Sequence, residues 1–219
     1  MYVQGPSCGA TSRSLSVRLA IMNLMMTFDP TPDARRLSLS PLTPADLELV
    51  FEVYSDPDTW QHLPVGRHKT REESRTIVDA SMSSRRDHEI GQWAVRVTDQ
   101  GADDGLAAGT FIGTGGVNMT PALVWNLGYR LSPMAWGRGF ATEIALAAVA
   151  AARIHNDSIA ITARVLSNNP ASARVAVRAG LRKVWEGPST TGAAAGISRE
   201  IFSDLDLGDD ALHSLIEAG

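Results

Sequence analysis

The stretch Trp136-Gly137-Arg138-Gly139-Phe140-Ala141-Thr142-Glu143 follows a strand-like segment, 123–131, and opens an apolar helix-like segment that runs to about Ile154. The first backbone N–H groups of a helix have no partner within the helix, and the helix dipole adds partial positive charge at that end. Glycines let the main chain approach a phosphate closely, because they carry no side chain. The stretch therefore predicts a site at which the N–H groups of residues 137–142 bind a pyrophosphate.

Two common phosphate-binding motifs do not fit this stretch. A Walker loop needs a Lys followed by Ser or Thr after its second glycine, and neither is present here. A dinucleotide-binding fingerprint needs a third glycine, whose place is taken by Thr142, and it follows the first strand of its domain. A nucleotide-binding α/β protein is therefore disfavoured.

The stretch resembles instead the coenzyme A pyrophosphate loop of the GCN5-related N-acetyltransferase (GNAT) superfamily. The pattern of that family is Gln or Arg, two free residues, Gly, one free residue, and then Gly or Ala. Here Trp136, Gly139 and Ala141 take the three fixed places, so that Trp stands where Gln or Arg is usual. That departure and the Phe-Ala-Thr-Glu continuation are similar to the RimJ/RimL-like branch, which acetylates the N-termini of ribosomal proteins.

A second motif, Asn169-Pro170-Ala171-Ser172, precedes a short helix-like segment that ends at Gly180. Asn suits a helix N-cap, Pro suits the first helical position and Gly suits a left-handed C-terminal cap, so the segment predicts a capped helix of a common kind. The GNAT family has Asn-x-x-Ser before a helix that ends in Gly-Phe, and Leu181 replaces the Phe here. The resemblance implies that Asn169 touches the pantetheine arm and that the Ser172 hydroxyl faces the sulfur.

The apolar periodicity predicts a regular order of strands and helices along the chain. The expected elements are strand 36–42, helix 43–54, helix 70–86, strands 92–97, 110–117 and 123–131, helix 142–154, strand 159–165, a helix from Asn169, and strands 182–186 and 198–207. This is the order of the acyl-CoA N-acyltransferase fold. The resemblance implies an α/β (α+β) architecture, with a mixed, mostly antiparallel sheet of six to seven strands, about four flanking helices, and a splay between strands 4 and 5.

The length of 219 residues allows one domain with additional tails. We expect the N-acetyltransferase domain at 36–207, a disordered N-terminal extension at 1–35, where charges are few, and a C-terminal tail at 208–219. The apolar segment 19–28 is too short to span a membrane, and no cleavage site of a signal peptide follows it.

Composition restricts the function further. The net charge of −4 and the pI near 5.7 argue against sequence-independent binding to nucleic acid, which needs clustered Lys and Arg. The single cysteine, Cys8, excludes an internal disulfide and a cysteine-based zinc site. We therefore expect a cytoplasmic protein that binds no nucleic acid, membrane or metal, as a monomer or a homodimer.

The resemblance implies that acetyl-CoA is the co-substrate and that an amine attacks its thioester directly in a ternary complex. Ser172 and Asn169 are the expected catalytic residues. The residues expected to bind the co-substrate are Tyr129, Arg130, Leu131, Trp136, Gly137, Arg138, Gly139, Phe140, Ala141, Thr142, Asn169 and Ser172. Gly128 marks either a bulge that opens the sheet or a simple packing position.

The general base is not evident from the sequence. Members of the branch often carry a Glu just before the Gly-Tyr pair on the fourth strand, but Asn126 stands there and cannot accept a proton. Either a water molecule serves, or a side chain from elsewhere does, with Glu89, His88 and His62 as weak candidates. An α-amine has a pKa near ~8, against ~10.4 for Lys, so a weak base favours an α-amine acceptor. Trp60 is expected to help wall the acceptor pocket.

The sequence is compatible with several classes of amine acceptor. A protein N-terminus, an amino sugar, an antibiotic or a polyamine could each supply the amine. A non-catalytic acyl-CoA-binding module of the same fold is a further alternative, which the missing Glu keeps open.

Overall fold

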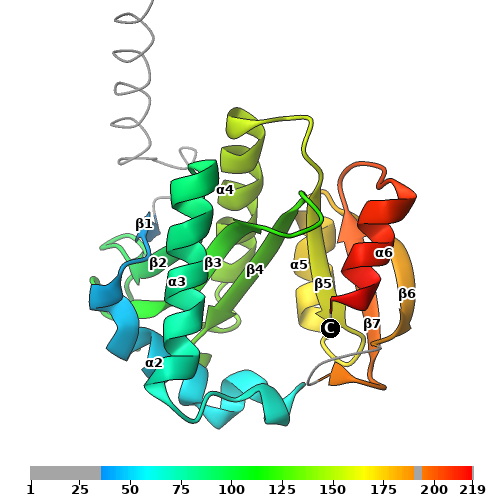
Figure 1. Cartoon of the computed structure of the whole chain (residues 1–219). Helices are drawn as coiled ribbons and strands as arrows, with labels where there is room; N and C mark the ends of the chain where they lie inside the picture. Colours follow the sequence, from blue (N-terminus) through cyan, green and yellow to red (C-terminus); the bar gives the residue numbers. More distant parts are fainter. Residues whose placement is uncertain (1–35, 190–193, 219) are drawn as a thin grey trace, which may run out of the picture.

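A seven-stranded mixed sheet forms the centre of the protein (Figure 1). The computed structural model describes residues 36–189 and 194–218, so the whole expected N-terminal extension, 1–35, lies outside the described residues. The strands are β1 (Leu37–Pro41), β2 (Trp93–Val97), β3 (Phe111–Met119), β4 (Trp125–Leu131), β5 (Ile161–Leu166), β6 (Arg182–Pro188) and β7 (Ser198–Ser203). Their order is β1-β2-β3-β4-β5-β7-β6, and every pair is antiparallel except β4 with β5. The predicted fold class is confirmed.

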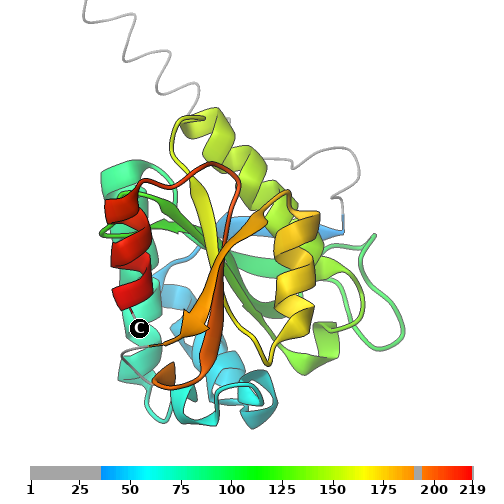
Figure 2. The same cartoon turned by 90° about the vertical axis from the view of Figure 1, so that its right-hand side faces the viewer.

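Helices cover both faces of this sheet (Figures 1 and 2). They are α2 (Leu47–Ser55), α3 (Arg71–His88), α4 (Phe140–His155), α5 (Pro170–Arg178) and α6 (Asp209–Glu217). α2, α3 and α6 lie on one face, and α4 and α5 lie on the other. The described residues thus form five α-helices where about four were expected. α6 is the addition, and its Leu215 is buried beside β7.

Local capping explains where two helices begin. The Thr70 hydroxyl accepts from the Glu73 N–H while the Glu73 carboxylate accepts from the Thr70 N–H, so both free donors at the start of α3 are satisfied. The Asn169 side chain likewise accepts from the Ser172 N–H at 3.2 Å and caps α5. Both predicted helix starts are confirmed.

The region before α3 differs from the prediction in detail. The expected helix over 43–54 is a 3₁₀ turn, Pro44–Asp46, that continues into α2. The expected loop over 55–69 contains two more 3₁₀ turns, Pro57–Trp60 and Pro64–Gly66. Each turn begins with a proline, whose fixed φ suits a helical start and whose missing N–H costs nothing there.

The sheet splits between β4 and β5. These strands pair only at Trp125 with Ile161 and at Asn126 with Thr162, and then they separate (Figure 1). The Thr162 hydroxyl donates to the Trp125 carbonyl at 2.8 Å and closes the apex of the split. The register between β3 and β4 runs without a shift through Gly128, so of the two interpretations of Gly128, a bulge or a packing position, the bulge is wrong. The split arises where strand pairing ends.

Small side chains bring α4 close to the sheet on the side of the split. Ala145, Ala148 and Ala152 of α4 are buried against Trp125 and Leu127 of β4. Such close packing fixes the start of α4 relative to the end of β4. No helix in the described ranges is long and apolar enough to cross a membrane.

Candidate active site

A cavity of about 920 Å³ opens where β4 and β5 have separated. All the residues predicted to bind the co-substrate line it, apart from Arg138. The predicted residues in its lining are Tyr129, Arg130, Leu131, Trp136, Gly137, Gly139, Phe140, Ala141, Thr142, Asn169 and Ser172. The cavity extends from the face of the sheet that carries α4 and α5 to the segment before α3, since Thr59 and His62 also line it.

The loop before α4 presents free backbone N–H groups to this cavity. Gly137 and Gly139 have φ of 75° and 83°, a left-handed conformation that costs other residues free energy. The N–H groups of 137–141 have no acceptor within the described chain, whereas the Thr142 N–H donates to the Gly139 carbonyl at 3.0 Å. An anion bound here would therefore meet free donors at a helix N-terminus, which is a fit for a pyrophosphate.

Arg138 does not face the cavity. Its guanidinium pairs with Asp103 in the turn between β2 and β3, and its Nε donates to the Met134 carbonyl at 3.0 Å. The side chain therefore anchors the outer side of the loop. No pattern in the sequence indicates this pairing, because Asp103 lies in a separate turn.

Arg36 is a second anchor of the loop that the sequence analysis missed. It donates to the Arg138 carbonyl at 3.0 Å, pairs with Glu143 in the first turn of α4, and lies 4.9 Å above the centre of the Phe140 ring. These contacts stabilise the conformation of the loop that carries the free N–H groups. A single arginine just before β1 thus positions the anion site, 102 residues away in the chain.

Tyr129 and Ser172 meet across the split. The Tyr129 hydroxyl donates to Ser172 Oγ at 3.2 Å, and Asn169 fixes Ser172 through its cap on α5. Burial raises the pKa of Tyr129 and its hydrogen bond with Ser172 only partly offsets this, so the phenol stays protonated at neutral pH. The hydroxyl pair can share a proton with a group placed between the two strands.

Side chains alternate between the two faces of β4. Tyr129 packs toward α4, beside Ile144, whereas the guanidinium of Arg130 lies on the opposite face, 3.3 Å from the centre of the Trp60 ring. Arg130 also donates to the Thr59 carbonyl. The cavity therefore has an α4 side with the anion site and an α2 side with Arg130. Trp60, expected to help wall the acceptor pocket, is not part of the cavity lining and instead supports Arg130 through the stacking contact.

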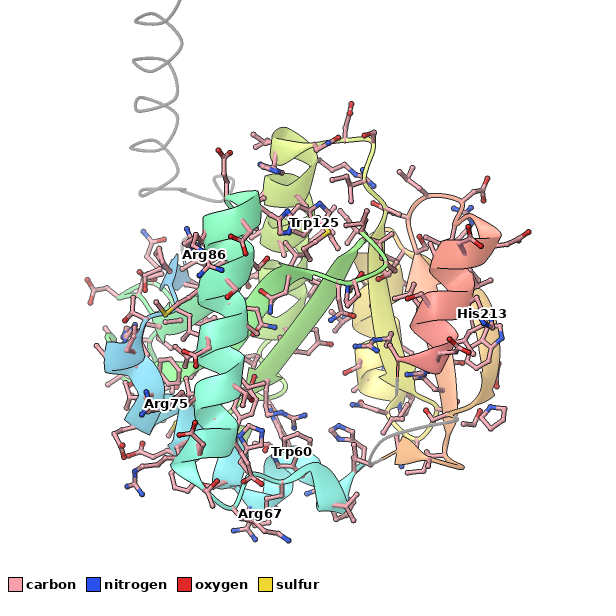
Figure 3. The ribbon with its side chains drawn as sticks, in the orientation of Figure 1. Trp60, Arg67, Arg75, Arg86, Trp125 and His213 are labelled. Carbon is pink, nitrogen blue, oxygen red and sulfur yellow. The ribbon has the colours of Figure 1, made fainter. Side chains whose placement is uncertain are left out.

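Of the three candidate bases, only His62 reaches the cavity. Its ring stacks on the Trp60 ring with the two ring centres 6.5 Å apart. The other two candidates lie elsewhere: the ring centres of His88 and Trp125 are 6.2 Å apart, and Glu89 Oε2 is 3.6 Å from His155 Nδ1. Figure 3 labels Trp60 and Trp125 near opposite ends of the molecule. Burial, and secondarily the charge of Arg130, lower the pKa of His62, so its imidazole is neutral at pH 7 and able to accept a proton.

Asn126 leaves β4 without a carboxylate beside the split. Its Oδ1 and the Oε1 of Gln92 are buried and have no hydrogen-bond partner among the described residues. Buried amide oxygens of this kind are normally satisfied by water or a ligand. Within the same described ranges, no group of three or more His, Cys, Asp and Glu side chains is arranged to hold a metal ion.

Comparison with known proteins assigns this arrangement to a family. A family model for the acetyltransferase (GNAT) domain matches residues 36–182. An acetyltransferase of the GNAT family from Bacillus anthracis is 19% identical, with a TM-score of 0.60, and the match covers 77% of this chain and 93% of that one.

Two further solved structures share the fold at similar distance. RimL, a ribosomal L7/L12 alpha-N-protein acetyltransferase in complex with coenzyme A, is 14% identical with a TM-score of 0.61, covering 78% of this chain and 96% of its own. A spermidine N-acetyltransferase chimera from Vibrio cholerae and hSSAT is 14% identical with a TM-score of 0.58, covering 78% and 95%. At these identities the likeness to the solved structures establishes the fold.

Proposed function

Because the chain belongs to the acetyltransferase (GNAT) family and is an N-acetyltransferase, we propose that it transfers the acetyl group of acetyl-CoA to a primary α-amine. The observation that carries this proposal is one cavity that holds free N–H groups at the start of α4 and the Tyr129–Ser172 hydroxyl pair at the split. The first feature suits a pyrophosphate, and the second suits a departing thiolate.

We further propose that the co-substrate lies along the unpaired edge of β4. From Leu127 to Leu131 this edge has no β5 partner, so its backbone groups can pair with the amides of a pantetheine arm, except the Leu131 carbonyl, which accepts from the Trp136 indole at 2.9 Å. RimL was solved with coenzyme A, which supports the same use of the split here.

In the proposed reaction the acceptor nitrogen attacks the thioester carbonyl carbon. The new C–N bond forms, the C–S bond breaks, and the electron pair leaves on sulfur. Ser172, hydrogen-bonded to Tyr129, shares a proton with that sulfur, whose thiol has a pKa of about 8.5 and therefore needs only partial protonation. The amine proton passes to His62, directly or through a water molecule, since His62 is the candidate base in the cavity wall.

A weak base of this kind favours an α-amine over a lysine. An α-amine has a pKa of about 8 and a lysine of about 10.4, so the α-amine needs about two pH units less help to lose its proton. The loop similarity and the likeness to RimL support the RimJ/RimL-like branch, and with it a cytoplasmic monomer or homodimer acting on a protein N-terminus. The likeness to a spermidine N-acetyltransferase favours a small polyamine as the second candidate.

A direct competition tests the acceptor class. One peptide has a free N-terminus and no lysine, a second has a blocked N-terminus and one lysine, and spermidine is the third acceptor. Mass spectrometry of a mixture with limiting acetyl-CoA should show acetylation mainly at the free N-terminus. Faster acetylation of the lysine peptide or of spermidine would contradict an α-amine acceptor while leaving the acetyltransferase activity itself intact.

A further inference from the structure

Arg130 carries a positive charge on the acceptor side of the cavity and has no carboxylate partner among the described residues. Its guanidinium stacks on Trp60 and lies 5.3 Å from the centre of the Tyr54 ring. Its one hydrogen bond within the described chain goes to the Thr59 carbonyl. A guanidinium has five N–H donors in a planar fork, so most of its donors are unused.

The two aromatic rings and the Thr59 carbonyl stabilise this charge only in part, because none of them is an anion. The side chain is half-buried, and burial lowers the pKa of Arg130, although an arginine stays protonated at any physiological pH. Burial and then the charge of Arg130 lower the pKa of the nearby His62, so this histidine is neutral at pH 7. An uncompensated, partly desolvated cation in a cavity wall gains most from an anionic ligand.

The rest of the lining does not supply that anion. The charged residues that line the cavity include four arginines, Arg130, Arg164, Arg174 and Arg178, and one carboxylate, Asp58. Asp58 accepts from the Gln61 side chain at 3.3 Å and makes no ion pair with the arginines in the described ranges. The lining of the whole cavity therefore has excess positive charge, to which Arg130 contributes on the α2 side.

The phosphates of the co-substrate are not suited to pair with Arg130. The free N–H groups expected to bind them begin α4, on one face of the sheet, and the Arg130 guanidinium projects to the other face against Trp60. The ligand that approaches from the α2 side is the acceptor. Its charge is therefore what Arg130 can select.

We propose that the acceptor carries a carboxylate or other anionic group close to the amine that is acetylated, and that Arg130 binds this group in a bidentate manner. This rests on the proposed function and specifies its substrate class. Along β4, Arg130 directly follows Tyr129, the residue that meets Ser172 across the split, and is about 3.3 Å further along at the rise of a strand. An anion so close to the split belongs to the residue that bears the amine or to the next one.

Two pairs of acceptors test this and separate the possible sources of the anion. The first pair consists of the peptide amides Ser-Glu-Ala-Ala and Ser-Gln-Ala-Ala, and the second of serine and serinamide. The acidic member of at least one pair should have a kcat/KM about tenfold higher or more, as a charged bidentate hydrogen bond allows. A preference in the first pair identifies an acidic peptide, and a preference in the second identifies a free amino acid.

Variants then connect the preference to Arg130. Arg130→Gln should reduce the ratio of the two kcat/KM values to near one, and Arg130→Lys should retain part of it because the charge remains. Arg67→Gln is the matched control, since Arg67 is exposed in the neighbouring turn and, within the described part of the chain, its side chain donates only to the Ser55 carbonyl. Equal rates within both pairs, or a ratio that survives Arg130→Gln, would overturn the proposal.

An equilibrium measurement keeps this test independent of turnover. Calorimetric titration of the N-acetylated products in the presence of coenzyme A should show the same preference for the acidic member, and Arg130→Gln should remove it. Equal affinities would overturn the anionic-acceptor proposal even without catalysis. Failure of every amine to release thiol, with preferential binding of the acidic product retained, would instead contradict the proposed α-amine transfer alone.

Discussion

The Tyr129 hydroxyl on β4 donates a hydrogen bond to the Ser172 hydroxyl on α5 at 3.2 Å, across the split in the sheet. The two residues are 43 positions apart, and no backbone pairing joins their elements at this point. Asn169 orients Ser172 from one side, while burial keeps Tyr129 protonated on the other. The pair is the proton-sharing group of the proposed reaction.

Removing either hydroxyl should slow the chemical step. We expect Tyr129→Phe and Ser172→Ala each to lower kcat by about tenfold to a hundredfold, toward the lower end for general acid catalysis because the thiol is itself a good leaving group. The dissociation constant of acetyl-CoA should change little, and stopped-flow thiol release together with calorimetry measures both quantities. The double variant should be about as slow as the slower single variant, and multiplicative losses would show that the residues act separately.

Gly139 should be required both for the loop conformation and for anion binding. Gly139 has a φ of 83°, in the left-handed region. Gly139→Ala adds a Cβ to a residue in this conformation and should lower the free energy of unfolding by about 1–2 kcal/mol. It also interferes with phosphate approach, so the affinity for acetyl-CoA should fall by about tenfold or more. Gly180→Ala is the control, because Gly180 has φ of 92° and open space around it. Equal loss of affinity in both variants would argue against a phosphate site at 137–141.

Arg36 should support co-substrate binding without touching the co-substrate. Arg36→Gln removes the ion pair with Glu143 and weakens the bond to the Arg138 carbonyl, so we expect a several-fold weaker affinity for acetyl-CoA with a small loss of thermal stability. Arg71→Gln, which breaks an exposed ion pair with Glu48, serves as the comparison and should leave the affinity unchanged. An unchanged affinity in Arg36→Gln would mean that the loop needs no anchor.

The pH profile should report on His62. Because burial lowers its pKa, His62 is neutral above a pKa that lies below 6.5, and it loses its function as a base when it binds a proton. With an α-amine acceptor, log kcat/KM should fall with slope one below the amine pKa near ~8 and with slope two below the His62 pKa. His62→Gln should be slower at neutral pH and should retain slope one throughout.

His68 provides the matched control for that profile. Burial also lowers the pKa of His68, but its Nδ1 bonds the Ser74 hydroxyl at 2.9 Å and it lines a separate pocket beside α2. His68→Gln should therefore retain the slope-two region. Loss of that region in His68→Gln, or its persistence in His62→Gln, would contradict the assignment of the base.

Local signals in the sequence predicted much of this structure. The caps at Thr70 and Asn169 depend on residues within one helical turn, and the glycines at 137 and 139 allow the left-handed φ that the loop needs. The resemblance to the family predicted two further features, the split between the fourth and fifth strands and the position of Ser172 beside it. Each of these features depends on short-range physics or on a pattern that the family shares.

What the sequence missed depends on contacts between distant segments. Arg36 anchors the loop 102 residues away, and Arg138, expected near a phosphate, turns outward because Asp103 lies beside it. The two 3₁₀ turns on either side of His62, which place it at the cavity, are too short to leave a periodic pattern. Arg130 was expected to bind through its position on β4, and only the fold shows that its side chain faces the acceptor side.

The most direct test of the central claim is thermal unfolding with increasing acetyl-CoA, on the wild type and on Gly139→Ala, followed in the same samples by thiol release after addition of an amine. At about 100 times the dissociation constant, the ligand should raise the free energy of unfolding of the wild type by roughly 2.7 kcal/mol. We predict that stabilisation, a much smaller one for Gly139→Ala at the same concentration, and thiol release that depends on the amine. No stabilisation of the wild type by acetyl-CoA, together with no thiol release, would contradict an acetyl-CoA site between β4 and β5.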